Sequence, residues 1–467
     1  MTTAPPTSLR PTVTELRETV RLAVPVIVVQ VGLMLMGVMD TIMVGRVSAA
    51  ALASVALGNL YFFVLTIFGM GVLLALDPVV SQAVGAGDRE GIARALQRGL
   101  VIAAVVTVVI SVALLGAGAV LRAAHQPAEV VPDAARYALV CIPGVLPFFI
   151  FVVFRQTLQA LRHMRPIVVS IVFSNVVNVL LNWAFIFGHA GLPAMGAVGS
   201  GWASTISRWI GALVLLAAAW RHLRTLLLPV RRGLLARGPL WRMLRLGLPV
   251  GLQQLLEAAA FGVIGLLMGL FGTVEVAAHQ VAINLASLTF MVPLAVGAAA
   301  AVTVGHAVGR GDGAAARRAA VAALICGAGF MCLSATSFLL MPGALARLYT
   351  TDAAVIALAS VLIPIAGVFQ VADGLQAVAA GVLRGVGDTR APLVLNLLGF
   401  WLLGTPVSLY LAFRTSAGPR GLWWGLVVGL AAVAILLLAR MRRRLRGTPR
   451  RVVIDDAGAH AIPLTLD

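Results

Sequence analysis

The sequence of 467 residues contains no lysine, three cysteines and few charged residues of either sign. Only 11% of its residues are charged, whereas an ordinary soluble domain carries about 25%. Without lysine the chain lacks the Gly-rich phosphate-binding loop of an ATPase, which ends in Gly-Lys-Ser/Thr. Cys141, Cys326 and Cys332 all lie in apolar stretches, which favours packing residues over a disulfide or metal framework. These absences argue against a soluble protein and against ATP hydrolysis by this chain.

Long apolar runs are the main feature that the sequence does have. Hydrophobic residues make up 60% of the chain, and its mean hydropathy is +1.01. A run of about 20 apolar residues crosses a bilayer as a helix. The polar first residues show no cleavable signal and lead directly into the first run. We predict an all-α integral membrane protein with twelve transmembrane helices, at residues 20–44, 51–76, 99–121, 137–159, 167–188, 197–220, 246–271, 277–303, 319–341, 355–383, 392–413 and 421–439.

The 35 basic residues, all arginine, predict how these helices are oriented. The segments on the side of the two termini carry 27 arginines and the opposite loops carry six, while Arg155 and Arg208 fall inside spans. Cytoplasmic loops are enriched in positive charge, so we expect both termini in the cytoplasm. The net charge of +18 and the tail sequence RMRRRLRGTPRR then favour contact with anionic lipid over a nucleic acid. Exclusive use of arginine fits a GC-rich bacterial genome, and hence the bacterial inner membrane.

The two halves of the chain repeat each other. QAVGAGD at 82–88 returns as HAVGRGD at 306–312, and RLAVP at 21–25 returns as RLGLP at 245–249, both 224 residues later. An offset that spans six helices keeps the copies in the same orientation, which predicts two six-helix lobes about an axis along the membrane normal. A cavity between two such lobes is typical of a transporter. The predicted parts are an N-terminal segment 1–19, a first lobe 20–220, a linker 221–245, a second lobe 246–439 and a basic tail 440–467.

Three acids lie well inside the predicted spans. Counting 1.5 Å per residue from the nearest loop arginine places Glu257 about 18 Å, Asp373 about 16 Å and Asp40 about 9 Å into the membrane. A charged side chain at that depth is costly and usually functional. Low dielectric favours the neutral form of a carboxylic acid, so a proton, Na⁺ or an organic cation can neutralise each group. The alternative is a permanent structural pairing with an arginine or a helix end.

Several polar side chains accompany these acids. Asn175, Asn178 and Asn182 share one helix face, where their amide oxygens can line a cation path beside Asp40 or simply bond to neighbouring helices. Arg208 either neutralises a first-lobe acid or faces water in the cavity. The same two interpretations as for the asparagines apply to the amides Gln253, Gln254, Gln280 and Asn284. Four further acids beside Gly or Arg at the ends of spans are interpreted as turn and cap residues, namely Asp77, Asp88, Asp312 and Asp388.

Several stretches together resemble the multidrug and toxic compound extrusion (MATE) transporters of the NorM-like branch. GVMDTIMVG at 37–45 resembles the first-helix aspartate pattern of that family, and LPVGLQQLLEAAAF at 248–261 its seventh-helix glutamate pattern. VAAHQVAINLASLTFMVPLAVG at 276–297 is similar to the eighth helix, and VFQVADGLQAVAAGVLRGVGDTR at 368–390 to the tenth. The resemblance covers roughly residues 15 to 440. It implies the V-shaped fold of the MATE and MOP transporters.

The resemblance also implies roles for single residues. Glu257 and Asp373 match the cation-coupling acids of the second lobe, with a possible Na⁺ site between them, and Asp40 and Asn178 match the first-lobe site. The implied activity is export of cationic, amphiphilic compounds in exchange for H⁺ or Na⁺, without a cofactor, by a monomer. An alternative on the same two-bundle plan is a flippase or exporter of a lipid-linked or other metabolite, which would need a cationic cavity. An enzyme is not expected, since no nucleophile or metal cluster gathers at one membrane face.

Overall fold

The structure is a computed structural model that describes residues 11–455 apart from 190 and 448. The outer parts of the predicted segments 1–19 and 440–467 therefore lie outside the described residues. Every regular element of the described part is a helix, and twelve helical runs are long and apolar enough to cross a membrane. The prediction of an all-helical protein with twelve membrane spans is confirmed.

Six runs come from each half of the chain. The first half contributes α1 (Val13–Gly45), α2 and α3 (Ala49–Leu73, Leu76–Gly85), α4 (Arg89–Leu115), α6 and α7 (Val131–Cys141, Val145–Ala160), α8 (Arg165–Phe187) and α9 (Gly196–Leu227). The second half contributes α10 (Arg237–Gly269), α11 (Thr273–Gly309), α12 (Gly313–Leu340), α14 (Ala353–Gly385), α15 and α16 (Arg390–Asn396, Thr405–Arg414) and α17 (Pro419–Arg446). Short helices α5 (Ala117–Ala123) and α13 (Pro342–Arg347) lie between spans.

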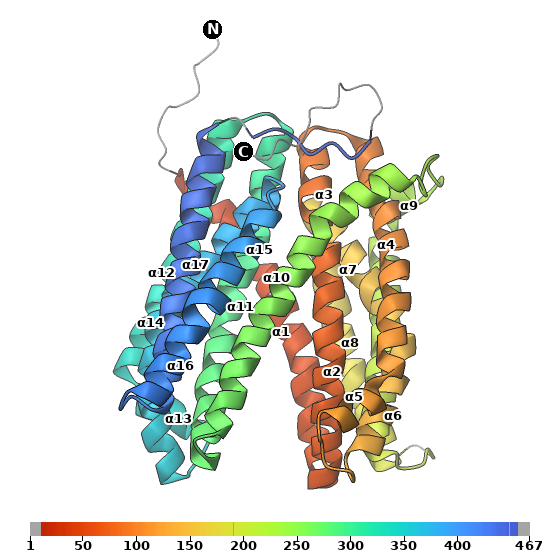
Figure 1. Cartoon of the computed structure of the whole chain (residues 1–467). Coiled ribbons are helices and arrows are strands. Elements are labelled where there is room, and N and C mark those ends of the chain that lie inside the picture. The colour runs from red at the N-terminus through yellow and green to blue at the C-terminus, as the bar shows by residue number, and fades with distance from the viewer. Residues whose placement is uncertain (1–10, 190, 448, 456–467) are drawn as a thin grey trace.

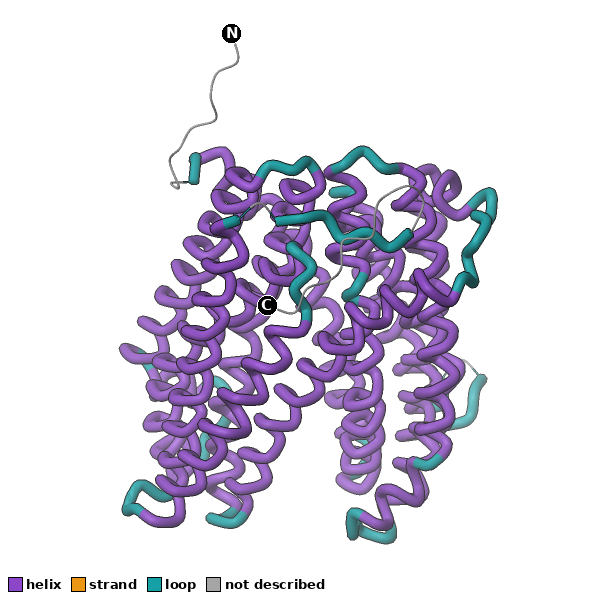
Figure 2. The backbone as a smooth tube through the Cα atoms, turned by 45° about the horizontal axis from the view of Figure 1, so that its top comes forward, coloured by secondary structure: helices purple, strands orange, loops and turns teal. Residues whose placement is uncertain are grey.

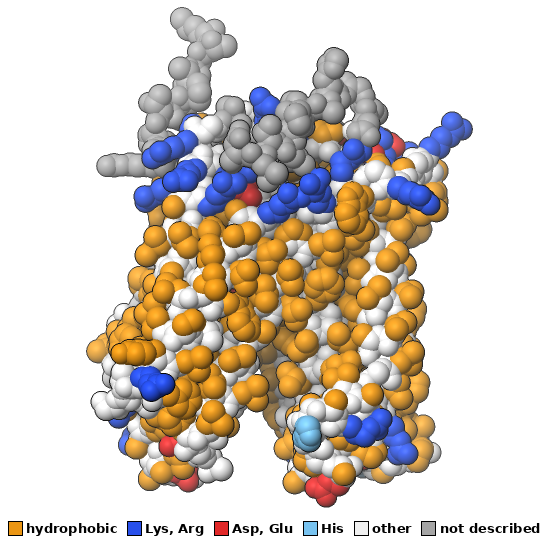
Figure 3. Space-filling model, viewed as in Figure 1, with side chains coloured by type: hydrophobic (Ala, Val, Ile, Leu, Met, Phe, Trp, Pro, Cys, Tyr) orange, Lys and Arg blue, Asp and Glu red, His pale blue; other side chains and the backbone are white. Residues whose placement is uncertain are grey.

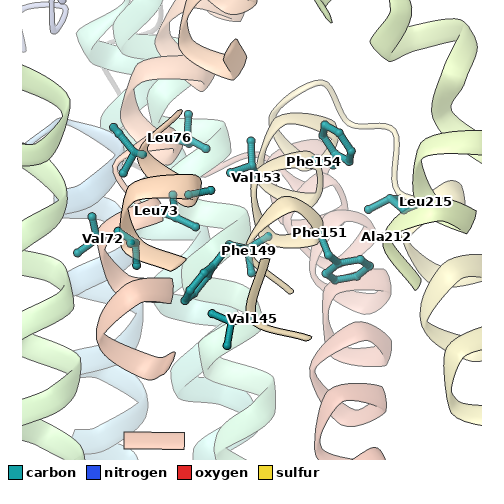
Figure 4. Close-up of a cluster of buried hydrophobic side chains, with 14 of the residues drawn as sticks. Val72, Leu73, Leu76, Val145, Phe149, Phe151, Val153, Phe154, Ala212 and Leu215 are labelled. Atoms are coloured by element: carbon teal, nitrogen blue, oxygen red, sulfur yellow. The ribbon is translucent and has the colours of Figure 1, made fainter. Parts of the chain in front are cut away.

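The two halves form two lobes that spread apart toward one end of the molecule (Figures 1 and 2). Each lobe has its own apolar core. In the first lobe, Leu73 of α2 lies beside Phe149 of α7, and Leu215 of α9 lies beside Phe151 and Phe154 on the other side of α7 (Figure 4). The end where the lobes meet carries a band of arginines, and the opposite end is hollowed between the lobes (Figure 3). We call these the arginine-rich end and the open end.

Close packing of small residues joins the lobes at the arginine-rich end. A Cβ atom on Gly85 of α3 would overlap the backbone of His306 in α11, and one on Gly309 of α11 would overlap the Gln82 carbonyl. Gln82 also donates from Nε2 to the Gly385 carbonyl of α14 over 2.8 Å. Small residues let helix backbones approach closely within a membrane, where no hydrophobic effect drives helices together. This contact therefore holds the arginine-rich end shut.

The repeated sequence motif builds the same turn in both halves. Gly87 and Gly311 have φ angles of +70° and +73°, a left-handed conformation that glycine adopts without strain. The aspartate that follows each glycine caps the next helix: Asp88 accepts from the Gly91 N–H, and Asp312 from the Ala315 N–H, each over 2.8 Å. The interpretation of these two acids as caps is confirmed.

The helices at the predicted linker are longer than their apolar parts. α9 continues to Leu227 and α10 begins at Arg237, so only residues 228–236 of the predicted linker 221–245 are not helical. Arginine and leucine favour helix, which lets both spans continue past the apolar region. The interruption contains Pro229 and Gly233, the residue types that end helices.

Residues 451–455 form an extended strap across the arginine-rich end, after α17 of the second lobe. Arg451 pairs with Asp88 of the first lobe over 2.5 Å, and the Val452 N–H donates to Gln82 over 2.6 Å. Asp455 pairs with Arg98 of α4 over 2.6 Å, while the buried Ile454 side chain joins the first-lobe core. The strap therefore fastens the end of the second lobe to the first.

A π-helix, Leu397–Gly404, separates α15 from α16. Its i→i+5 pattern is seen at the end, where the Thr405 N–H bonds to the Phe400 carbonyl. Gly399 and Gly404 lie on the face that packs closely against Gly429 of α17. Such segments occur often at functional sites, and this one directly follows Asn396, which belongs to the polar cluster of the second lobe.

Candidate functional site

The first-lobe acid, Asp40 of α1, is held by neutral donors from two other helices. Its Oδ1 accepts from Asn182 Nδ2 of α8 over 2.5 Å, and its Oδ2 accepts from Ser204 Oγ of α9 over 2.6 Å. Asn182 Nδ2 also donates to Asn178 Oδ1 over 3.1 Å. Only 5% of the Asp40 surface is exposed. The structure thus brings together the predicted residues Asp40, Asn178 and Asn182.

Arg208 lies one helical turn after Ser204 in α9, but it does not form an ion pair with Asp40. No carboxylate of the described residues lies within 4.0 Å of its guanidinium, which instead sits over the Phe62 ring, 4.0 Å from the centroid. A cation over an aromatic face is stabilised by the ring's quadrupole. Direct pairing of Arg208 with a first-lobe acid is therefore not seen in this conformation.

The second-lobe cluster surrounds Glu257 of α10. Its Oε1 accepts from Gln376 Nε2 of α14 over 3.0 Å, and its Oε2 accepts from Asn396 Nδ2 of α15 over 3.3 Å. Trp401 of the π-helix donates to the neighbouring Leu256 carbonyl over 3.2 Å, which ties that helix to α10. Side chains of α14 and α15 therefore converge on one carboxylate of α10.

Asp373 of α14 lies one helical turn before Gln376 and close enough to Glu257 for their charges to interact. The Asp373 side chain is buried, with 6% exposed. Its Oδ1 has no hydrogen-bond donor among the described residues, and the same holds for Gln376 Oε1 and Asn396 Oδ1. A buried acceptor without a donor is costly, so these oxygens favour a proton or a hard cation nearby.

The other predicted amides have different surroundings. Asn175 donates to the Gly32 carbonyl of α1 over 3.0 Å, so it bonds two helices together, as one of its two interpretations expected. Gln280 donates to Asn284 within α11 over 3.2 Å, and Gln280 is exposed. Gln253 is buried in α10, with 5% of its surface exposed. None of these three joins Asp40, Glu257 or Asp373 through a hydrogen bond given by the described residues.

Two acids interpreted as caps have another role. Asp77 of α3 is buried between the lobes, where it accepts from Gln156 over 2.7 Å and pairs with Arg384 of the second lobe over 3.5 Å. Asp388 pairs with Arg440 and Arg444 of α17 over 2.8 and 2.7 Å. Neither side chain caps a helix, because each acid instead neutralises arginine across a helix contact. Asp388 does lie in a turn, where its N–H bonds to the Leu383 carbonyl over 2.9 Å. It follows that Arg440 and Arg444 of the predicted lipid anchor bind protein.

Ser204, Gln376 and Asn396 complete the two clusters and were not singled out from the sequence. Neutral side chains of these types are common in membrane helices, where most of them bond locally. A weak signal existed for one of them, since Gln376 follows Asp373 by three positions and so shares its helix face. Ser204 and Asn396 join their acids only through the packing of distant helices.

Twelve spans in two repeated lobes, with a polar cluster around an acid inside each lobe, define the fold of a multi-pass membrane transporter. The MatE family model matches residues 25–184 and 249–410, whose starts lie 224 residues apart (249 − 25). That spacing equals the repeat found in the sequence. The chain belongs to the MatE family, while its place in the NorM-like branch stays a prediction.

Solved structures share this fold across nearly the whole chain. The eukaryotic MATE transporter AtDTX14 is 24% identical with a TM-score of 0.84, over 93% of this chain and 98% of that one. An outward-facing multidrug resistance MATE transporter is 20% identical with a TM-score of 0.84, covering 92% and 96%. A MOP superfamily transporter from Pyrococcus furiosus, described as having a binding pocket of reversed polarity, is 21% identical with a TM-score of 0.81, covering 92% and 96%.

Proposed function

We propose that this protein is a secondary active multidrug efflux antiporter. It exports cationic, amphiphilic compounds in exchange for H⁺ or Na⁺ by alternating access, in a bacterial inner membrane with the arginine-rich end in the cytoplasm. The observation that carries the proposal is the Glu257–Asp373 cluster. Asp373 is buried and the neighbouring Glu257 is half-buried, with no arginine within 4.0 Å of either carboxylate among the described residues, and with three acceptor oxygens left without a donor.

This cluster suits a mobile positive partner. Two adjacent carboxylates in a medium of low dielectric repel each other when both are ionised, so binding of one H⁺ or Na⁺ relieves that repulsion. Glu257, Asp373, Gln376 and Asn396 supply oxygen atoms, which are the ligands that hard cations prefer. Entry of a cationic compound from the other side gives an alternative source of positive charge, which displaces the first.

In the proposed cycle, the shape of the molecule corresponds to one step. The lobes are closed at the arginine-rich end and apart at the open end (Figure 3), which in the proposed orientation is the outward-facing state that releases the compound. A ligand shifts an equilibrium between two conformations only through its different affinities for them. Coupling therefore requires that H⁺ or Na⁺ binds the outward-facing form more tightly than the inward-facing form.

Uptake of a fluorescent cation into everted vesicles, which corresponds to efflux from the cell, tests the proposal when ΔpH and a Na⁺ gradient are imposed separately. We expect Glu257→Gln to abolish gradient-driven efflux, because an amide cannot lose the proton or charge on which exchange depends. Asp373→Asn should do the same. Glu129→Gln is the matched control, since Glu129 is exposed in an outer loop. Unimpaired efflux by Glu257→Gln, at equal amounts of folded protein in the membrane, would contradict the coupling role.

A further inference from the structure

A groove between α10 and α15 opens on the lipid-facing side of the second lobe, toward the arginine-rich end. Its volume is about 240 Å³, several times the roughly 30 Å³ that one water molecule occupies in the liquid. The residues that line the groove change from aromatic and basic at one end to aliphatic at the other. Its residues include Trp241, Arg245, Leu248 and Leu252 from α10, and Arg390 and Leu393 from α15.

The two arginines of the groove lack partners among the described residues. Neither Arg245 nor Arg390 forms a hydrogen bond or an ion pair with any described residue, and both side chains are exposed. Other arginines at this end do have acidic partners, as Arg384 has Asp77 and Arg440 has Asp388. The described residues therefore leave both guanidinium groups free to bind an anion.

The residue types along the groove follow the same order as the headgroup and acyl chains of a phospholipid. Trp241 is 60% exposed beside Arg245, and tryptophan favours the level of the lipid headgroups. Leu252 follows Arg245 by seven residues, about 10 Å further along the helix, which is the level of the acyl chains. Guanidinium groups bind phosphate through paired N–H donors, and basic pockets between membrane helices bind anionic headgroups. A cationic compound, by contrast, would be repelled by the two arginines.

We propose that this groove binds one anionic phospholipid, with its phosphate between Arg245 and Arg390 and an acyl chain along Leu248, Leu252 and Leu393. The lipid bridges α10 and α15. These helices also carry Glu257 and its donor Asn396, whose hydrogen bond joins α10 to α15 further along the two helices. The lipid therefore stabilises the same helix contact from the arginine-rich end. The proposal does not depend on what the protein transports.

Native mass spectrometry of the purified full-length protein, titrated with phosphatidylglycerol and with phosphatidylcholine, tests this site. We expect tighter binding of phosphatidylglycerol, and a loss of roughly 30-fold in its affinity for the Arg245→Gln/Arg390→Gln variant. That figure takes about 1 kcal/mol for each arginine at 1.4 kcal/mol per tenfold. The Arg442→Gln/Arg443→Gln variant removes the same charge from exposed positions of α17 and should keep the affinity of the wild type.

A second measurement locates the lipid without changing the arginines. Phosphatidylglycerol with brominated acyl chains should quench tryptophan fluorescence in the wild type. The part of this quenching that comes from Trp241 should be absent in Trp241→Phe. Equal affinity for both lipids, an equal loss in the Arg442→Gln/Arg443→Gln control, or no difference in quenching between the wild type and Trp241→Phe would overturn the proposal. Full competition by inorganic phosphate would also overturn it, because a free anion would then be the ligand.

Discussion

Asp40 and Asp373 are both buried acids, but their oxygens have different surroundings. Both oxygens of Asp40 accept hydrogen bonds from neutral donors, over 2.5 and 2.6 Å. Asp373 Oδ1 has no donor among the described residues, and the charge of Glu257 is close by. Hydrogen bonds to a carboxylate stabilise its ionised form, whereas burial beside a like charge destabilises it. Asp373 therefore gains more than Asp40 from a proton or cation.

Asp77 gives a prediction at the same scale. Asp77→Ala should lower the free energy of unfolding by about 3–5 kcal/mol, because it leaves Arg384 buried without its counter-charge. The measurement is a reversible denaturant titration in detergent. The Asp77→Ala/Arg384→Ala variant should lose less than the sum of the two single variants, and a strictly additive result would contradict the pairing.

An exposed pair provides the control for this prediction. Asp133 and Arg136 lie 3.6 Å apart with side chains that are 50% and 71% exposed. Solvent screens such a pair, so Asp133→Ala should change the free energy of unfolding by no more than about 0.5 kcal/mol.

At the scale of elements, the contact of α3 with α11 depends on glycine. Gly309→Leu should prevent closure of the arginine-rich end, because its side chain would overlap the Gln82 backbone. Overpacking typically costs about 1–3 kcal/mol, which corresponds to a shift of roughly 5- to 150-fold toward the opened form. Gly329→Leu on α12 is the control, since no atom lies within 4 Å of its added Cβ.

Closure can be followed through Ser81, which is fully buried at this contact. In a background with the three native cysteines replaced by alanine, a Ser81→Cys thiol should react with a membrane-impermeant maleimide roughly tenfold faster when Gly309→Leu is present. An unchanged rate would show that the glycine contact does not hold the end shut.

The elements themselves were largely predictable from the sequence. Apolar runs near 20 residues placed all twelve spans, and the offset between QAVGAGD and HAVGRGD gave the two lobes. The π-helix at Leu397–Gly404 was not predicted, because its residues are as apolar as those of any other span. Asp77 was misinterpreted for a similar reason, since its partner Arg384 lies 307 residues away (384 − 77) and meets it only through the packing of the lobes.

At the scale of the whole molecule, residues 451–455 fasten the second lobe to the first. Opening of the arginine-rich end in the proposed cycle requires these contacts to separate. The Arg451→Gln/Asp455→Asn variant should increase the opened population roughly 5- to 30-fold, which corresponds to about 1–2 kcal/mol from pairs of this exposure. Spin labels at Arg165→Cys and Arg443→Cys, one in each lobe, would report the distance distribution.

High ionic strength provides a control for the role of the ion pairs of the strap. Ionic strength screens the partly exposed pair Arg451–Asp88 more than the buried Arg98, so high salt should shift the wild type in the same direction as the variant but by less, and leave the variant itself little changed. Identical distance distributions for wild type and variant at low salt would contradict a fastening role.

The ion pair of Asp88 should make the contact between the strap and the first lobe depend on pH. Partial burial raises the pKa of Asp88, but the hydrogen bonds from Arg451 and the Gly91 N–H outweigh burial and hold its pKa below the ordinary value. Because the folded-state pKa is depressed, the pair stabilises the closed form fully above the unfolded value of about 3.9. That stabilisation is lost as the pH falls through the lower pKa of the folded protein, and the label distances should broaden there.

The wider turn between Asn396 and Thr405 holds one residue more than an ordinary helical turn. Gly399 and Gly404 are five positions apart, and this winding places both on the face that meets Gly429. Removing one residue between the two glycines would leave them four apart, which is one face of an ordinary helix, so α16 would keep its orientation. Adding a residue there would instead rotate everything after it by about 100° about the helix axis, so single-codon deletions should be tolerated in this stretch far better than insertions.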